Sequence, residues 1–130
     1  MEFTKLPLSE QVLKGVEAAG FSVCTEVQAK VLPVSLTGRD VMVQSKTGSG
    51  KTAIYVLTIL EAMAKARAAG KSDPKALIIA PTRELAVQIE EDTAKLSVAV
   101  KDLVVGSFFG GVGYGKQDEL IEQGCDIFVA

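Results

Sequence analysis

Short runs of apolar residues alternate along the chain with longer segments in which apolar residues recur every three or four positions. The segment Thr82–Leu96 shows the helical pattern most clearly, with Leu85, Ile89 and Leu96 on one face and carboxylates opposite. The apolar runs are short and continuous, which is typical of strands covered on both faces. The pattern therefore predicts strands and helices in alternation.

The order of these segments predicts the fold class. Ser9 and Thr25 are placed to cap the first two helices, and Gly20 to end the first. Strands and helices in alternation indicate an α/β fold, a parallel sheet with helices on both faces. The pattern predicts strands at 41–44, 75–80, 102–109 and 126–130, and helices at 10–20, from 26 onward, and at 50–67, 82–96 and 116–123.

Composition limits the class of protein. The chain has 130 residues, of which 48% are hydrophobic and 23% are charged, and these values suit one soluble globular domain and argue against disorder. The formal net charge is -2, so the chain has no global positive field to attract nucleic acid. Any binding of nucleic acid must therefore come from local geometry.

Cysteine usage and hydropathy indicate the compartment. Cys24 and Cys125 lie far apart and the chain has no histidine, so neither a zinc site nor a disulfide framework is expected. We therefore expect a reducing, cytoplasmic compartment. The first ten residues carry charges where a signal peptide has a long apolar run, and the apolar segment 53–64 is too short to cross a bilayer, so no membrane attachment is expected.

The segment Ser45–Thr52, with the sequence SKTGSGKT, lies between an expected strand and an expected helix. Backbone N–H groups at a helix start lack intrahelical partners and attract anions. Gly48 and Gly50 can take a positive φ, which costs another residue about 1–2 kcal/mol. Lys51 supplies a positive charge for terminal phosphates, and the Thr52 hydroxyl is a suitable ligand for Mg²⁺.

The segment therefore predicts a cradle for a nucleoside triphosphate, with Lys51 and Thr52 in the catalytic roles. A flexible strand-to-helix connection is the alternative. Ser45 departs from the usual pattern, which has glycine or in some families alanine, but serine is small enough to fit. The expected nucleotide-binding residues of this loop are Ser45, Lys46, Thr47, Gly48, Ser49, Gly50, Lys51 and Thr52.

Motifs on both sides of the loop suggest a family. The segment GFSVCTEVQ at 20–28, with Phe3 before it, resembles the Q motif of DEAD-box ATP-dependent RNA helicases, and PTRELA at 81–86 and a glycine pair at 110–111 follow in that family's order. The resemblance covers essentially the whole chain. It implies a single truncated RecA-like P-loop domain with ATP and Mg²⁺ as cofactors, in which 1–29 form the Q-motif region and 38–130 the α/β core.

Gln28 is the expected selector of adenine. A glutamine amide offers one acceptor and one donor side by side, which match the donor and acceptor on one edge of adenine, whereas guanine presents two acceptors there. The resemblance implies that Phe21 and Phe3 help to hold the base, Phe3 by packing on the ring. Without the motif, Gln28 would be interpreted as a solvent-facing helix residue, and both phenylalanines as core residues.

The resemblance also implies a site for single-stranded RNA, formed by Pro81, Thr82, Arg83, Gly110 and Gly111. Hydroxyl, guanidinium and backbone N–H groups bind phosphates without distinguishing bases. Sequence-independent binding to the RNA backbone is therefore expected. The alternative for Arg83 is a surface ion pair with a nearby glutamate.

Other functions account for fewer of the motifs. The segment from Gly111 leads to Lys116 where a dinucleotide fingerprint has glycine, and a kinase or GTPase would not require Gln28 or PTRELA. A non-catalytic nucleotide-binding module stays open, because no expected strand ends in the acidic residues that hold Mg²⁺ and orient water.

We therefore interpret the chain as the N-terminal part of a DEAD-box helicase domain. The parent enzyme would couple ATP binding and hydrolysis to RNA duplex remodelling. We expect residues 1–130 alone to show no RNA-stimulated turnover and no unwinding. We also expect self-association through an exposed sheet edge.

Overall fold

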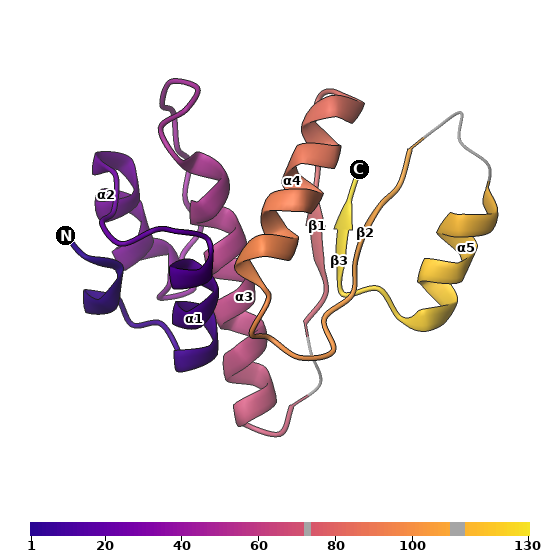
Figure 1. Cartoon of the computed structure of the whole chain (residues 1–130), viewed down its shortest axis with the longest axis horizontal. Coiled ribbons are helices and arrows are strands. Elements are labelled where there is room, and N and C mark those ends of the chain that lie inside the picture. The colour runs from indigo at the N-terminus through magenta and orange to yellow at the C-terminus, as the bar shows by residue number, and fades with distance from the viewer. Residues whose placement is uncertain (72–73, 110–113) are drawn as a thin grey trace.

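The computed structural model describes residues 1–71, 74–109 and 114–130. The helices of the N-terminal half pack together, and the rest of the chain forms a small sheet with further helices beside it (Figure 1). In chain order the elements are η1 (Phe3–Lys5), α1 (Glu10–Ala18), α2 (Glu26–Ser35), α3 (Lys51–Ala68), β1 (Ala76–Ile78), α4 (Arg83–Leu96), β2 (Val105–Ser107), α5 (Tyr114–Gln123) and β3 (Ile127–Val129). No helix within these described ranges is long and apolar enough to cross a bilayer.

The three described strands form one parallel sheet in the order β1-β3-β2. The chain passes from β1 through α4 to β2, and then returns through α5 to the central strand β3. Because such connections are right-handed, these opposite directions place α4 and α5 on opposite faces of the sheet. In Figure 1, α4 lies in front of the sheet and α5 lies beside β2. The predicted α/β class is confirmed.

The two faces of the sheet differ in how well they are covered. Ile78, Ile127 and Val129 are buried on one face, and α4 packs against β2 and β3. The side chain of Leu77 points to the other face and is 63% exposed. Ile79, just beyond the end of β1, is 77% exposed. Because α5 contacts β2, the apolar surface beside β1 remains open to solvent.

The helices form the larger part of the core. Helix α3 contacts α1, α2 and α4, and its residues Val56, Leu57 and Leu60 are completely buried. Gly15 of α1 faces α4 so closely that a Cβ atom there would overlap the carbonyl oxygen of Leu96. Glycine is therefore required where these two helices meet.

Both predicted capping residues stand at the N-caps of their helices, but they act differently. The Thr25 hydroxyl accepts a hydrogen bond from the backbone N–H of Gln28 in its own helix, as a capping residue does. The Ser9 hydroxyl instead donates to the Glu61 carboxylate of α3 at 2.8 Å, and the Ser9 backbone N–H donates to the same oxygen at 2.9 Å. Glu61 therefore fastens the start of α1 to α3.

The prediction of a strand at 41–44 is wrong. These residues have no strand pairing within the part of the chain that the structure describes, and they run beside the start of α3, apart from the sheet (Figure 1). The Met42 side chain is 99% exposed. A strand needs hydrogen bonds from a neighbouring strand, and an apolar run without that neighbour stays irregular.

Candidate functional site

The loop before α3 has the backbone conformation that its glycines predicted. Gly48 has φ of +82° and Gly50 has φ of +88°, and α3 begins directly after Gly50, at Lys51. A Cβ atom at Gly48 would lie in open space, so glycine is needed there for its φ alone. A Cβ atom at Gly50 would overlap the side-chain nitrogen of Gln28. Gly50 is therefore required by both its φ and its close neighbour.

Bonds within the loop close it around the start of α3. The Lys51 ammonium donates to the carbonyl oxygen of Ser45, and the Ser49 hydroxyl donates to the carbonyl oxygen of Lys46 at 2.7 Å. The lysine charge thus lies at the loop, and the same loop leads into the first N–H groups of α3. Both features attract anions, and together they suit a phosphate group.

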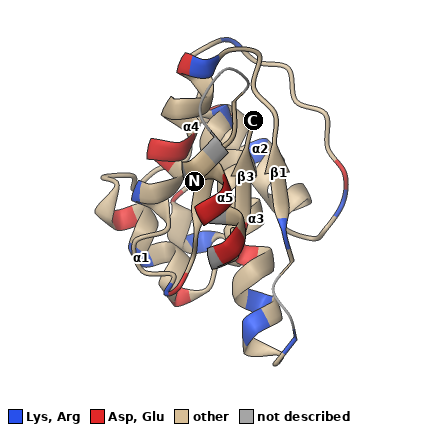
Figure 2. Ribbon diagram, turned by 90° about the vertical axis from the view of Figure 1, so that its right-hand side faces the viewer, with Lys and Arg blue, Asp and Glu red and all other residues tan. Residues whose placement is uncertain are grey.

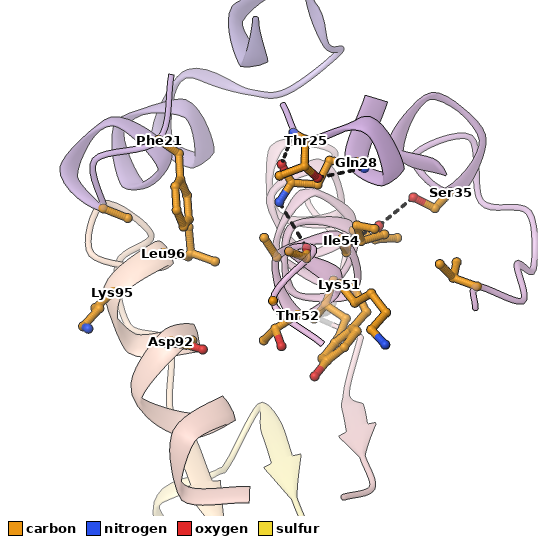
Figure 3. A pocket seen from close by; sticks show the side chains of 18 of the residues that line it. Phe21, Thr25, Gln28, Ser35, Lys51, Thr52, Ile54, Asp92, Lys95 and Leu96 are labelled. Atoms are coloured by element: carbon orange, nitrogen blue, oxygen red, sulfur yellow. Dashed lines mark hydrogen bonds between the residues drawn. The ribbon is translucent and has the colours of Figure 1, made fainter. Parts of the chain in front are cut away.

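Two hydrogen bonds join this loop to α2, which is far away in the sequence. The Thr25 hydroxyl donates to the carbonyl oxygen of Ser49 at 2.8 Å, and the Gln28 side-chain nitrogen donates to the carbonyl oxygen of Gly50 at 3.1 Å. The Gln28 side-chain oxygen accepts from the Thr25 backbone N–H at 2.9 Å. Gln28 is only 3% exposed and connects the cap of α2 to the phosphate loop (Figure 3).

These bonds use only part of the Gln28 amide. An amide group has two N–H donors and two acceptor lone pairs, and the protein uses one of each. One donor and one acceptor therefore remain for a ligand. The contact of Thr25 with the loop was missed from sequence, although the spacing from Thr25 to Gln28 is that of a capping box and could have placed both side chains together.

A cleft of about 1020 Å³ brings most of the predicted nucleotide residues together. It is lined by Phe21 and Gln28 from the N-terminal region, and it extends to Asp92 and Lys95 of α4, which the sequence analysis did not single out (Figure 3). The predicted loop residues that line it are Thr47, Gly48, Gly50, Lys51 and Thr52. A base and its phosphates could therefore contact groups of one continuous cleft.

Phe3 lies behind this surface. Its side chain is 2% exposed, and its ring stacks on that of Phe21 with the centroids 6.2 Å apart. Phe21 is exposed and lines the cleft. Phe3 therefore supports the ring that faces the cleft, and its direct contact with a base stays a prediction.

A second, smaller cleft of about 410 Å³ lies at the carboxyl ends of the strands. In parallel α/β sheets this end commonly forms the ligand site. The Thr82 hydroxyl caps α4 by accepting from the Leu85 N–H at 3.2 Å. The cleft contains the predicted RNA-binding residues Pro81, Thr82 and Arg83, together with Ala80, Phe108, Phe109 and Ala130. Gly110 and Gly111, also predicted for this site, lie outside the described residues.

Positive and negative side chains are mixed, and basic residues do not form a broad surface on the face in view (Figure 2). Figure 2 shows acidic and basic residues mixed over the face in view, with basic residues near the far end of α3. Lys65 and Arg67 lie in the last turn of that helix, where positive charge stabilises the helix dipole. The Arg67 guanidinium donates to the carbonyl oxygen of Lys101. Lys65 thus stabilises the end of α3 by its position, and Arg67 also bonds that end to Lys101.

The two cysteines are free thiols and both are buried. Burial raises the pKa of Cys24 and of Cys125 above the ordinary thiol value. The Cys125 thiol also donates to the carbonyl oxygen of Ile127 at 3.2 Å. Both side chains therefore stay protonated near neutral pH and act as small core residues.

Comparisons with a family profile and with individual known sequences indicate the same family. The profile of the DEAD/DEAH box helicase family matches residues 25–130. The ATP-dependent RNA helicase RhlB of Pasteurella multocida is 47% identical over 99% of this chain and 30% of that protein. The RhlB of Xanthomonas oryzae pv. oryzae is 41% identical over 98% of this chain and 23% of that protein. The chain therefore spans less than a third of the length of these relatives.

Solved structures give the same family. A DEAD box protein from Methanococcus jannaschii superimposes with a TM-score of 0.82 and 30% identity, covering 100% of this chain and 34% of that one. The RNA helicase Prp28 from Chaetomium thermophilum, bound to ADP, superimposes with a TM-score of 0.83 and 32% identity, covering 99% of this chain and 31% of that one. Both the backbone and the sequence therefore agree with the family profile.

Proposed function

Because this chain belongs to the DEAD/DEAH box helicase family, we propose that it binds ATP in the larger cleft, between the phosphate loop and the Q-motif region. The observation that supports this best is the pair of hydrogen bonds from Thr25 to Ser49 and from Gln28 to Gly50. They hold the residues expected at the base in a defined position relative to the residues expected at the phosphates.

Each group has a definite role in this proposal. The loop N–H groups and the Lys51 ammonium bind the phosphates, and the remaining donor and acceptor of Gln28 bind the edge of adenine. Phe21 and Phe3 help to hold the base. The Thr52 hydroxyl is the group that would hold Mg²⁺, which when bound reduces the negative charge on the phosphates. We assign Lys51 and Thr52 to catalysis in the whole protein.

For the whole protein we propose ATP-dependent remodelling of RNA duplexes, because the relatives are named ATP-dependent RNA helicases. Pro81, Thr82 and Arg83 would contact the RNA backbone from the smaller cleft, together with Gly110 and Gly111. In this assignment 1–29 form the Q-motif region and 38–130 the core of one truncated domain. The two free, protonated thiols suit a reducing, cytoplasmic compartment.

A non-catalytic module that binds adenine nucleotides is the second candidate. It is favoured by the residues that follow two of the described strands: β1 leads to Ala80 and Pro81, and β2 leads to Phe108. None of these is acidic, whereas hydrolysis requires acidic residues that hold the metal and orient water. We therefore expect this chain to bind ATP and to release no phosphate. A phosphate-release assay with single-stranded RNA tests this expectation, and release that Lys51→Ala removes would contradict the non-catalytic candidate.

We further propose that the chain associates with itself through β1. This strand lies at the edge of the described sheet, and the apolar side chains of Leu77 within it and Ile79 directly after it are exposed. An edge strand presents unpaired N–H and C=O groups that a second chain can pair with.

Replacing Lys51 tests the nucleotide site. We expect Lys51→Ala to abolish the rise in melting temperature that Mg-ATP produces, while the variant keeps its fold. Bound ligand stabilises the native state by about 2.7 kcal/mol at 100-fold its dissociation constant, so the shift is readily measured. The exposed Lys71 supplies the control, since Lys71→Ala should melt and bind like the unmodified chain.

Parallel titrations with GTP test the role of Gln28. We expect the unmodified chain to prefer ATP, and a Gln28→Ala variant to lose this preference. A folded, unmodified chain without any ATP-dependent shift would contradict the proposal.

A further inference from the structure

The smaller cleft contains an aromatic side chain to which the family resemblance assigned no role. Phe109 follows β2 and its ring lies against the guanidinium of Arg83, with the guanidinium carbon 5.9 Å from the ring centroid. This distance is within the range of a cation–π contact. Arg83 is the first residue of α4 and follows directly after the cap residue Thr82.

The contact joins segments that are not neighbours in the sheet. Arg83 follows β1 and Phe109 follows β2, whereas β3 lies between those two strands. Neighbouring strands are about 4.8 Å apart, so the two side chains bridge roughly twice that distance above the end of β3. Ala130, which follows β3, lines the same cleft. The Arg83–Phe109 pair therefore lies across the carboxyl end of the central strand.

The backbone segment that carries Phe109 is held by hydrogen bonds and by a ring contact. The Phe108 backbone N–H donates to the carbonyl oxygen of Val129 at 2.8 Å, and the Phe108 ring packs against that of Phe128 with centroids 5.3 Å apart. The Phe109 carbonyl oxygen accepts from the Gln117 side chain of α5 at 3.0 Å. The segment is thus held by β3 and α5 before any ligand binds.

Arg83 has a long and exposed side chain. Ordering a long side chain costs conformational entropy, and a partner that orders it in advance reduces the cost of binding. A guanidinium that stacks on an aromatic ring contacts it through the flat face of the guanidinium. The N–H groups of the guanidinium then still point outward, in the plane of the guanidinium. Those N–H groups are the ones that pair with phosphate oxygens.

We propose that Phe109 is a positioning residue, which orients Arg83 for contact with an RNA phosphate. The proposal rests on the function proposed above, because it assumes that Arg83 binds the RNA backbone. Phe109 acts through Arg83 and does not read bases. A base stacked directly on Phe109 is the competing idea, and the experiment below separates them.

The test is a double-mutant cycle with a defined probe, fluorescein-labelled oligouridine, measured by fluorescence anisotropy with the full chain. The single variants are Arg83→Ala and Phe109→Leu, and the third variant carries both changes. Leucine keeps an apolar side chain of similar size without an aromatic face. We expect Phe109→Leu to weaken RNA binding about two- to five-fold, which corresponds to an exposed cation–π contact. In the Arg83→Ala background the same change should have no further effect.

Phe109→Tyr supplies the control, since it keeps the ring and should restore the original RNA affinity. The salt dependence adds a second readout: Arg83→Ala should reduce the slope of log affinity against log salt by about 0.7, the value for one phosphate contact on a single strand. ATP affinity and melting temperature should stay unchanged in Phe109→Leu, so a general loss of structure would be detected.

The outcomes separate the two proposals. If the unmodified chain does not bind the probe, or if Arg83→Ala binds it equally well, the RNA site proposed above is wrong and this inference with it. If Arg83→Ala weakens binding but Phe109→Leu does not, only the positioning role is wrong. If Phe109→Leu weakens binding equally with and without Arg83, Phe109 contacts RNA directly and the positioning role is again wrong.

Discussion

The molecule has a helical half, formed by α1, α2 and α3, and a sheet half, formed by the strands with α4 and α5. The two halves differ in how completely their polar side chains are bonded and their apolar side chains buried. In the helical half, buried polar groups have partners from distant segments: Gln28 bonds to Gly50 of the phosphate loop, and Glu61 of α3 bonds to Ser9 at the start of α1. Around β1, by contrast, the large apolar side chains of Leu77 and Ile79 are mostly exposed. The two halves therefore contribute unequally to stability.

The difference follows from the nature of the two elements. A helix satisfies its backbone hydrogen bonds within itself and needs only one apolar face to be covered. A strand forms its backbone hydrogen bonds with neighbouring strands, and a parallel sheet needs a covering layer on each face. Since the described strands are short and β1 is at an edge, we infer that the helical half supplies most of the folding free energy.

The largest expected effect compares two leucines, one in each half. Leu60→Ala removes a completely buried side chain of α3 and should lower the free energy of unfolding by about 2–5 kcal/mol. Leu77→Ala, on the open face of β1, should change it by about 0.5 kcal/mol or less. Urea denaturation of both variants measures the difference. Equal losses would show that the sheet half is as well packed as the helical half.

The next effect compares two glycines of the phosphate loop. Gly48→Ala and Gly50→Ala both place a Cβ atom at positive φ, which costs about 1–2 kcal/mol. Only the Cβ atom at Gly50 also overlaps the Gln28 side chain, so this variant should lose more stability and more ATP affinity. Thermal melts and ATP titrations on both variants isolate the contribution of Gln28. Similar behaviour of the two would mean that the bond between Gln28 and Gly50 contributes little.

The smallest expected effect on folding comes from a charge on the sheet edge. Ile79→Lys replaces an exposed apolar residue next to β1 and should leave the melting temperature almost unchanged, while it suppresses self-association. Size-exclusion chromatography with light scattering over a range of concentrations measures the mass. Val98→Lys is the control, because Val98 is 63% exposed but lies outside the strands. If both variants reduce association equally, the edge of β1 is not the interface.

The sequence predicted the local features of the nucleotide site well. Gly48 and Gly50 were expected to take positive φ, and both do, because only glycine adopts that conformation without cost. The start of α3 and the cap at Thr25 were also correctly predicted. Local chemistry determines each of these features within a few residues.

Two predictions were incomplete or wrong because their outcome depended on contacts with distant segments. The segment 41–44 has the apolar character of a buried strand, but without a neighbouring strand in the described part of the chain it remains irregular. Ser9 was expected to cap its own helix, whereas its hydroxyl donates to Glu61, which is 52 residues further along the chain. A hydrogen-bond partner at that distance cannot be deduced from neighbouring residues.

The sequence by itself determined the family, the α/β class and the conformation of the phosphate loop, because each depends on residue types at short spacing. Only the tertiary structure decided that Gln28 is bonded to Gly50, that Phe3 lies behind Phe21, and that Phe109 meets Arg83 across the end of β3. These contacts join segments that lie far apart in the chain. Their geometry depends on how α2, α3 and the three strands pack, and packing is a property of the whole fold.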